Sequence, residues 1–192
     1  MKKLLCLILA LVMLCGCVCA QADQLCYMPQ MNMAVNLPDE YLALTMGTDE
    51  DVFAAYGMDK AAIVDFMVAN DTYLIILPKD FTYEIDVAMA ANTIDSFNAH
   101  TEKELLETLP EVTKALESMG VVFDRGEFYT NGRDHYLRLF YHVPGEVPTY
   151  AVQYYTVQHY QAINFRLFTY GMEATAEQLA AYETVMENVI FD

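Results

Sequence analysis

Several residue types are scarce in this chain of 192 residues, and each scarcity argues against a class of function. There is no tryptophan, and the two serines, Ser96 and Ser118, lie outside any Gly-x-Ser-x-Gly motif, which argues against a serine hydrolase of that type. Lysine and arginine number 10 against 27 aspartates and glutamates, for a formal net charge of −17. Because nucleic acids and anionic lipids are bound by Lys and Arg, this balance argues strongly against both as partners.

Motifs for disulfides and metals are also missing. Four of the five cysteines lie within the first 19 residues, and the four histidines show no His-x-x-x-His spacing. We therefore expect no cofactor and no disulfide framework. One cluster of soft ligands, Cys26 with Met28, Met31 and Met33, leaves a copper(I) site as an alternative. Met31 and Met33, two residues apart on a strand, are equally typical of an ordinary core.

The first 22 residues have the pattern of an export signal. Lys2 and Lys3 precede an apolar run from Leu4 to Leu14, which is too short to span a bilayer. Cleavage after Ala22 would release a mature chain with Cys26 as its only cysteine. A lipobox ending at Cys17 would instead give a lipidated protein tethered to a membrane surface. Both routes predict an extracytoplasmic protein, either secreted or a cell-surface lipoprotein.

The remainder, residues 23–192, is predicted to form one α+β domain. Thr101 with Glu104 and Thr175 with Gln178 are capping boxes that predict two helices, the first interrupted at Pro110. Between these helices, residues 121–170 alternate polar and apolar side chains with the period of strands. We therefore expect a largely antiparallel β-sheet covered by helices.

This order of elements resembles the PsbP-like family. The resemblance rests on Asn-Leu-Pro-Asp-Glu-Tyr at residues 36–41, a helix, a strand meander, Ala-Thr-Ala-Glu-Gln-Leu-Ala-Ala-Tyr-Glu at residues 174–183, and a final Ile-Phe-Asp. It implies an α/β/α sandwich around an antiparallel sheet. It also implies an exported accessory subunit or lipoprotein that is not an enzyme, and it transfers no functional residue to this chain.

Two arginines placed mid-strand between apolar residues, Arg138 and Arg166, are the candidate site. A type II turn at residues 143–146 would pair Val143 with Pro148 and place both arginines on one sheet face with Gln153. Each arginine could pair with an acid on a covering helix, its stem packed on the sheet. Alternatively, Arg138, Gln153 and Arg166 could bind a small anion or the carboxylate of a partner.

These observations favour an exported, non-enzymatic binding or accessory protein. Its partner would be another protein or a small ligand, and the strong negative charge favours a monomer. The alternative from a different class is an extracytoplasmic hydrolase that uses surface carboxylates in a cleft. Two converging acids, at least one of them desolvated, would favour the hydrolase, and two arginines neutralised internally would favour the binding protein.

Overall fold

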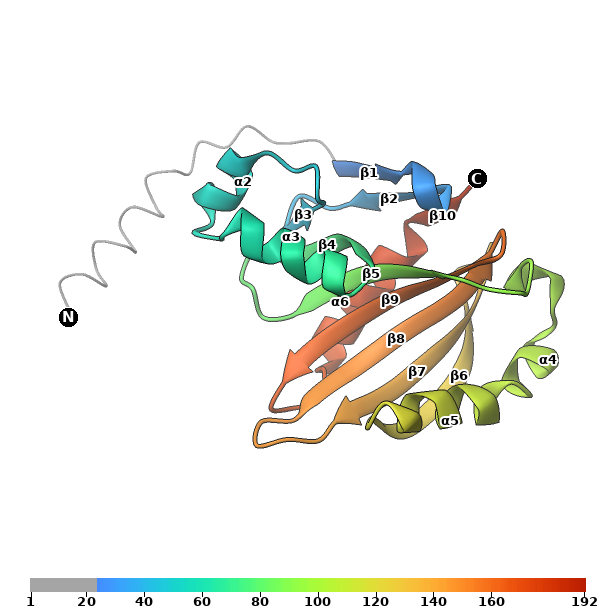
Figure 1. The fold of residues 1–192 in the computed structure, drawn as a ribbon. Coiled ribbons are helices and arrows are strands. Elements are labelled where there is room, and N and C mark those ends of the chain that lie inside the picture. The colour runs from blue at the N-terminus through green and yellow to red at the C-terminus, as the bar shows by residue number, and fades with distance from the viewer. Residues whose placement is uncertain (1–23) are drawn as a thin grey trace.

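A computed structural model describes residues 24–192, so the predicted signal and the lipidation candidate Cys17 lie outside the described residues. The main element is an antiparallel seven-stranded sheet in the order β3-β4-β5-β9-β8-β7-β6 (Figure 1). Its strands are β3 (Tyr41–Leu44), β4 (Thr72–Pro78), β5 (Glu84–Ala91), β6 (Val122–Thr130), β7 (His135–Val143), β8 (Thr149–Gln158) and β9 (Gln161–Tyr170). The chain crosses from β5 to the far edge at β6 and then returns strand by strand until β9 pairs with β5.

A smaller sheet joins the two ends of the described chain. It contains β1 (Gln24–Met28), β2 (Met33–Leu37) and β10 (Val189–Phe191), with β2 in the middle. Met28, Met31 and Met33 are buried in the hydrophobic core, and Cys26 packs against the same core, where burial raises the pKa of its thiol. This apolar packing is the ordinary core role that the sequence also allowed for Met31 and Met33.

Three of the five α-helices in the described residues begin at a side-chain cap. The five helices are α2 (Glu50–Ala55), α3 (Lys60–Ala69), α4 (Glu102–Leu106), α5 (Leu109–Ser118) and α6 (Ala176–Glu187). Asp59 caps α3, and both predicted capping boxes form, at Thr101 for α4 and at Thr175 for α6. Pro110 lies in the first turn of α5, so the predicted interruption separates α4 from α5. Among the described residues, no helix is long and apolar enough to cross a membrane.

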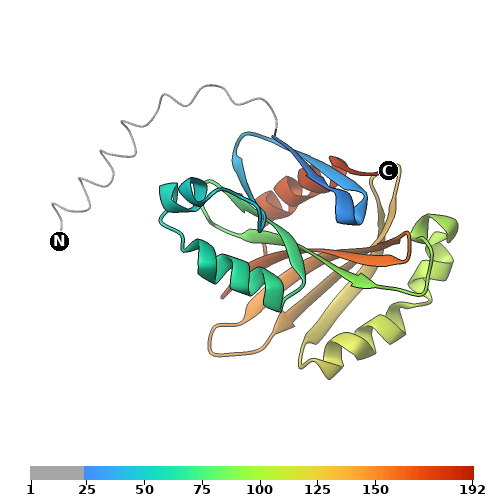
Figure 2. The same cartoon turned by 45° about the horizontal axis from the view of Figure 1, so that its top comes forward.

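The two faces of the seven-stranded sheet are covered differently. On one face, here called the α6 face, helix α6 and the smaller sheet enclose a core that includes Tyr154, Phe165 and Tyr182. On the other, here called the open face, α2 and α3 cover β3 and β4, and α4 and α5 cover β6 to β8. Figure 2 shows the red helix α6 behind the sheet and the teal α3 and yellow α5 in front. The predicted α+β sandwich around an antiparallel sheet is confirmed.

One prediction, the register between β7 and β8, is wrong by one residue. Val143 pairs with Thr149 instead of Pro148, and Gly145 is not among the glycines with positive φ that a type II turn requires. Proline has no N–H to donate to a strand ladder, so the loop extends to include Pro148 and pairing begins one residue later. Since neighbouring residues of a strand point to opposite faces, this shift changes which side chains share a face.

Candidate functional site

The register places Arg166 and Arg138 on opposite faces of the sheet. Gln153 pairs with Arg166 across β8 and β9, whereas Arg138 pairs with Tyr154. Residues paired across an antiparallel ladder point to the same side, so Gln153 and Arg166 lie together on the open face and Arg138 on the α6 face. The predicted common face for all three is therefore wrong, because it depended on the shifted register.

Arg166 is held by a buried carboxylate on the neighbouring strand. Its Nε donates to Oδ1 of Asp86 at 2.7 Å and its Nη2 donates to Oδ2 at 2.6 Å. Asp86 is 1 % exposed, and burial raises the pKa of its carboxyl, an effect that Arg166 opposes. Burial alone would lower the pKa of Arg166, but the bonds to Asp86 raise it, so the guanidinium stays charged. The acid that neutralises Arg166 thus comes from a strand, not from a covering helix.

Gln153 belongs to a short relay of polar side chains beside this ion pair. The Tyr141 hydroxyl donates to Oε1 of Gln153 at 2.9 Å, and Nε2 of Gln153 donates to Oδ1 of Asn164 at 2.7 Å. Together with Asp86 and Arg166, these groups form a polar strip across β5, β9, β8 and β7 on the open face. Most of the polar groups in this strip form hydrogen bonds with one another.

On the α6 face, two carboxylates neutralise the charge of Arg138. Its Nε donates to Glu127 on β6 at 2.7 Å, and its Nη1 donates to the Tyr154 hydroxyl at 3.1 Å and to Glu183 on α6. The bond to Glu183 matches the expected pairing with an acid on a covering helix. Both mid-strand arginines are therefore paired internally, and their role in binding a ligand stays a prediction.

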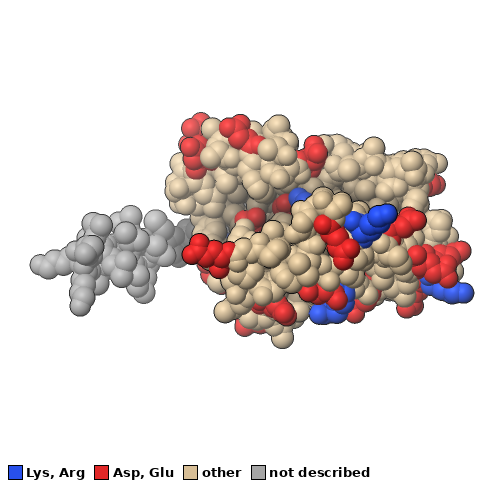
Figure 3. Space-filling model, turned by 60° about the horizontal axis from the view of Figure 1, so that its bottom comes forward, with Lys and Arg blue, Asp and Glu red and all other residues tan. Residues whose placement is uncertain are grey.

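An apolar cavity opens next to the polar strip, between α3 and the sheet. It has a volume of about 490 Å³ and is closed at the back by Leu44, Ile75 and Leu77. Three aromatic side chains that line it remain well exposed: Phe66 on α3 at 40 %, Phe81 at 46 % and Tyr170 at 60 %. Figure 3 shows that one side of the molecule is hollowed between two bulges, with acidic and basic atoms in the hollow.

Phe81 is held at this cavity in a strained conformation. It lies in the loop between β4 and β5 with φ of +54°, a left-handed conformation that is unusual for a bulky side chain. The loop is fixed by Asp80, whose Oδ1 accepts bonds from the Thr82 N–H and hydroxyl at 3.1 and 2.8 Å. Strained residues concentrate at binding sites, where the surrounding structure keeps them in place.

Glu84 adds a carboxylate to the wall of the cavity. It lies two residues before Asp86 on β5 and therefore on the same face. Burial raises the pKa of Glu84, the negative charge of Asp86 adds to the effect, and the positive charge of Arg166 opposes it. A further cation placed beside Glu84 would stabilise its ionised form. We define the cavity with Glu84, Phe66, Phe81 and Tyr170 as the aromatic groove.

Sequence reasoning missed the aromatic groove because its residues come from separate elements between residues 44 and 170. Phe66 lies on α3 and Phe81 in the loop between β4 and β5, and no local motif marks either as a binding residue. The available signal was Phe81, an aromatic residue in a turn that also holds Lys79 and Asp80, where polar residues are usual.

Comparison with solved structures identifies the fold. The solution structure of cyanobacterial PsbP (CyanoP) from Synechocystis sp. PCC 6803 is similar over 93 % of this chain and 97 % of that chain, with a TM-score of 0.51 and 13 % identity. The chain has a PsbP-like fold. At this identity the similarity establishes the fold alone, in agreement with the resemblance found in the sequence.

A protein of unknown function from Pseudomonas aeruginosa, PA94, gives a TM-score of 0.39 and 9 % identity over 90 % of this chain and 99 % of that chain. A similarity this weak does not establish a common fold. No model of a protein family and no curated protein sequence matches the chain. The function of this protein therefore has to be inferred from its own side chains.

Proposed function

We propose that this protein is an exported, non-enzymatic binding module that holds a segment of a partner protein in the aromatic groove. The observation that carries the proposal is the set of three exposed aromatic side chains around an apolar cavity, Phe66, Phe81 and Tyr170. Exposed apolar clusters of this kind mark interaction sites, and aromatic residues are enriched at protein interfaces.

The charge of the groove favours a partner segment with a cation among apolar residues. Glu84 is the acidic side chain that lines the cavity, and its ionised form is disfavoured by burial and by Asp86. A lysine or arginine of the partner would stabilise the ionised form, while the rest of the segment would contact the aromatic side chains. The surplus of acids over bases in the whole chain also favours a cationic partner.

The alternative of a carboxylate-dependent hydrolase has less support at this position. Glu84 and Asp86 share a face of β5, but Asp86 is buried and both of its oxygens accept bonds from Arg166. A carboxyl group in that position is not free to exchange a proton with a substrate. The internal neutralisation of Arg138 and Arg166 is the outcome that we expected of a binding protein.

The proposal is tested with three fluorescein-labelled peptides that share an apolar sequence and differ in one central residue, which is lysine, glutamine or glutamate. We expect fluorescence polarisation to show the tightest binding for lysine and the weakest for glutamate. Phe66→Ser should weaken binding of all three peptides. Glu84→Gln should abolish the preference for lysine over glutamine. The glutamine peptide should still bind through its apolar residues.

Val68→Ser is the matched control, because Val68 is exposed on the same helix, α3, but does not line the cavity. This variant should bind all three peptides as the wild type does. Equal binding by Phe66→Ser and Val68→Ser, or a lysine preference that survives Glu84→Gln, would refute the proposal.

A further inference from the structure

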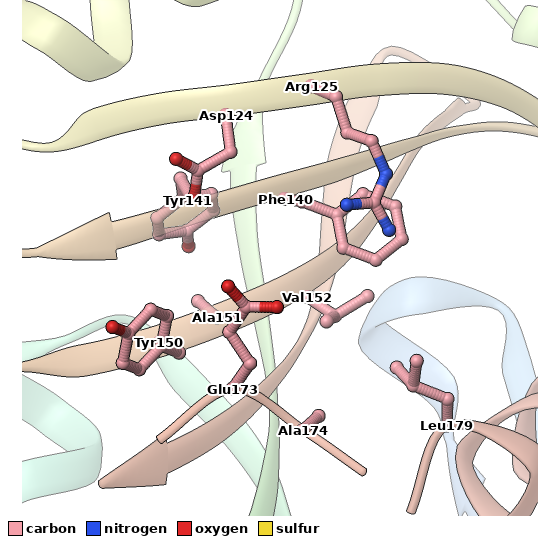
Figure 4. A pocket seen from close by; sticks show the side chains of 10 residues that line it. All are labelled: Asp124, Arg125, Phe140, Tyr141, Tyr150, Ala151, Val152, Glu173, Ala174 and Leu179. Atoms are coloured by element: carbon pink, nitrogen blue, oxygen red, sulfur yellow. The ribbon is translucent and has the colours of Figure 1, made fainter. Parts of the chain in front are cut away.

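A second cavity lies at the opposite side of the sheet, near the start of α6. It has a volume of about 170 Å³ and is formed by β6, β7 and β8, the segment before α6, and Leu179 on α6 (Figure 4). This volume corresponds to about six water molecules in the liquid, so the cavity suits a small molecule and not a peptide. It is separate from the aromatic groove, and its ligand is independent of the proposed function.

Arg125 supplies a positive charge at one side of this cavity. Its guanidinium carbon lies 3.5 Å from the centre of the Phe140 ring, which holds the planar group flat against the aromatic face. Unlike Arg138 and Arg166, Arg125 makes no ion pair or hydrogen bond with the described residues. A stacked guanidinium keeps its N–H edge available, and that edge matches a carboxylate in a bidentate manner.

The position of Arg125 depends on an irregularity in β6. The register between β6 and β7 shifts between Phe123 and Arg125, so that Asp124 is the extra residue of a β-bulge. The bulge brings Arg125 opposite Phe140. Bulges of this kind redirect side chains next to functional sites. The strand is thus built to present Arg125 to this cavity.

Glu173 supplies the opposite charge. It lies in the segment before α6, and Figure 4 shows its carboxylate directed into the cavity, across from the guanidinium of Arg125. Among the described residues, Glu173 forms no ion pair, either with Arg125 or with another cation. The other acid of the cavity, Asp124, contacts Nδ1 of His142 at 3.2 Å. Apolar side chains, Val152 and Leu179 among them, line the rest of the cavity.

We propose that this cavity binds a small zwitterion, an aliphatic α-amino acid, with its carboxylate on Arg125 and its ammonium group on Glu173. The aliphatic side chain would contact Val152 and Leu179. A cation and an acid that face one cavity without pairing with each other are what such a ligand requires. Arg125 and Glu173 are both exposed to solvent, so a ligand with one charge would leave the other group hydrated and would make one charge-assisted contact in place of two.

The test is isothermal titration calorimetry with L-leucine and two analogues, 3-methylbutan-1-amine without the carboxylate and 4-methylpentanoate without the ammonium group. We expect L-leucine to bind at least tenfold more tightly than either analogue. Arg125→Met and Glu173→Gln should each weaken its binding at least tenfold. Lys114→Met and Glu117→Gln on α5 are matched controls of the same charge change, outside the cavity, and should bind normally.

A second readout locates the binding site in the wild type, so it does not depend on whether a variant folds. In the wild type, L-leucine should shift the backbone amide NMR signals of Arg125, Phe140 and Glu173 and leave those of Phe66 and Phe81 unchanged. No saturable binding at millimolar L-leucine would overturn the inference. Equal binding of 4-methylpentanoate, or full binding by Arg125→Met, would overturn it as well.

Discussion

Replacing Arg166 by methionine tests whether this arginine is committed to the fold. Methionine keeps the length and the apolar stem of the side chain but leaves the Asp86 carboxylate without its two charged donors. Asp86 is 1 % exposed and the Arg166 side chain is 25 % exposed, so solvent screens this ion pair weakly. Removing one partner of a buried pair costs about 3–5 kcal/mol. For a chain of this size, that lowers the melting temperature by roughly 6–20 °C.

The stability that Arg166→Met loses depends on pH, and the pKa of Asp86 sets the direction of this dependence. Burial already raises the pKa of Asp86, and removing Arg166 takes away the interaction that opposes the rise. The folded variant then binds a proton more tightly than the unfolded chain, so its stability falls as pH increases from about 4 through the raised pKa. We therefore expect Arg166→Met to be more destabilising, relative to the wild type, at about pH 8 than at about pH 5.

Urea unfolding followed by circular dichroism measures these differences. The double variant Asp86→Leu with Arg166→Met removes both charges and should recover most of the stability that the single variant loses. A loss below about 1 kcal/mol in Arg166→Met would refute the reasoning. So would equal losses in the single and double variants. The first of these results would leave Arg166 available for the ligand-binding role predicted from the sequence.

Two further substitutions test local features. The Tyr136 hydroxyl is buried without a hydrogen-bond partner among the described residues, so Tyr136→Phe should raise the free energy of unfolding by about 1 kcal/mol. The readout is a higher urea midpoint with an unchanged m-value, and a lower midpoint would contradict it. Phe81→Asn should weaken peptide binding in the aromatic groove and keep stability within about 1 kcal/mol of the wild type, because Asn tolerates the left-handed conformation that strains Phe81. A urea titration that shows a loss above about 2 kcal/mol would contradict that expectation.

Much of the fold could be predicted because its signals are local. A capping box at Thr101 or Thr175 needs only a partner three residues away. The break before α5 likewise follows from a single residue, Pro110, because proline is disfavoured inside a helix. The turn between β6 and β7 contains Asn131 followed by Gly132, a dipeptide typical of hairpins, and Gly132 has a positive φ.

The candidate site was harder to predict than the fold, because it depends on the pairing of strands that are far apart in the sequence. A difference of one residue in the loop before Thr149 decided whether Arg138 shares a face with Gln153. The stacking of Arg125 on Phe140 depends on a bulge that no local motif indicates. The small sheet that pairs β2 with both β1 and β10 was also missed as a unit, since its strands lie at the two ends of the described chain.

Site-specific photocrosslinking in the native host tests the central claim, that the aromatic groove holds a partner protein. A benzophenone amino acid would replace Phe66 in the groove and, as the control, Val68 on the same helix. We predict one discrete adduct from position 66, none from position 68, and loss of the adduct when Glu84→Lys is added. The same adducts from both positions, or an adduct that persists in Glu84→Lys, would contradict the proposal.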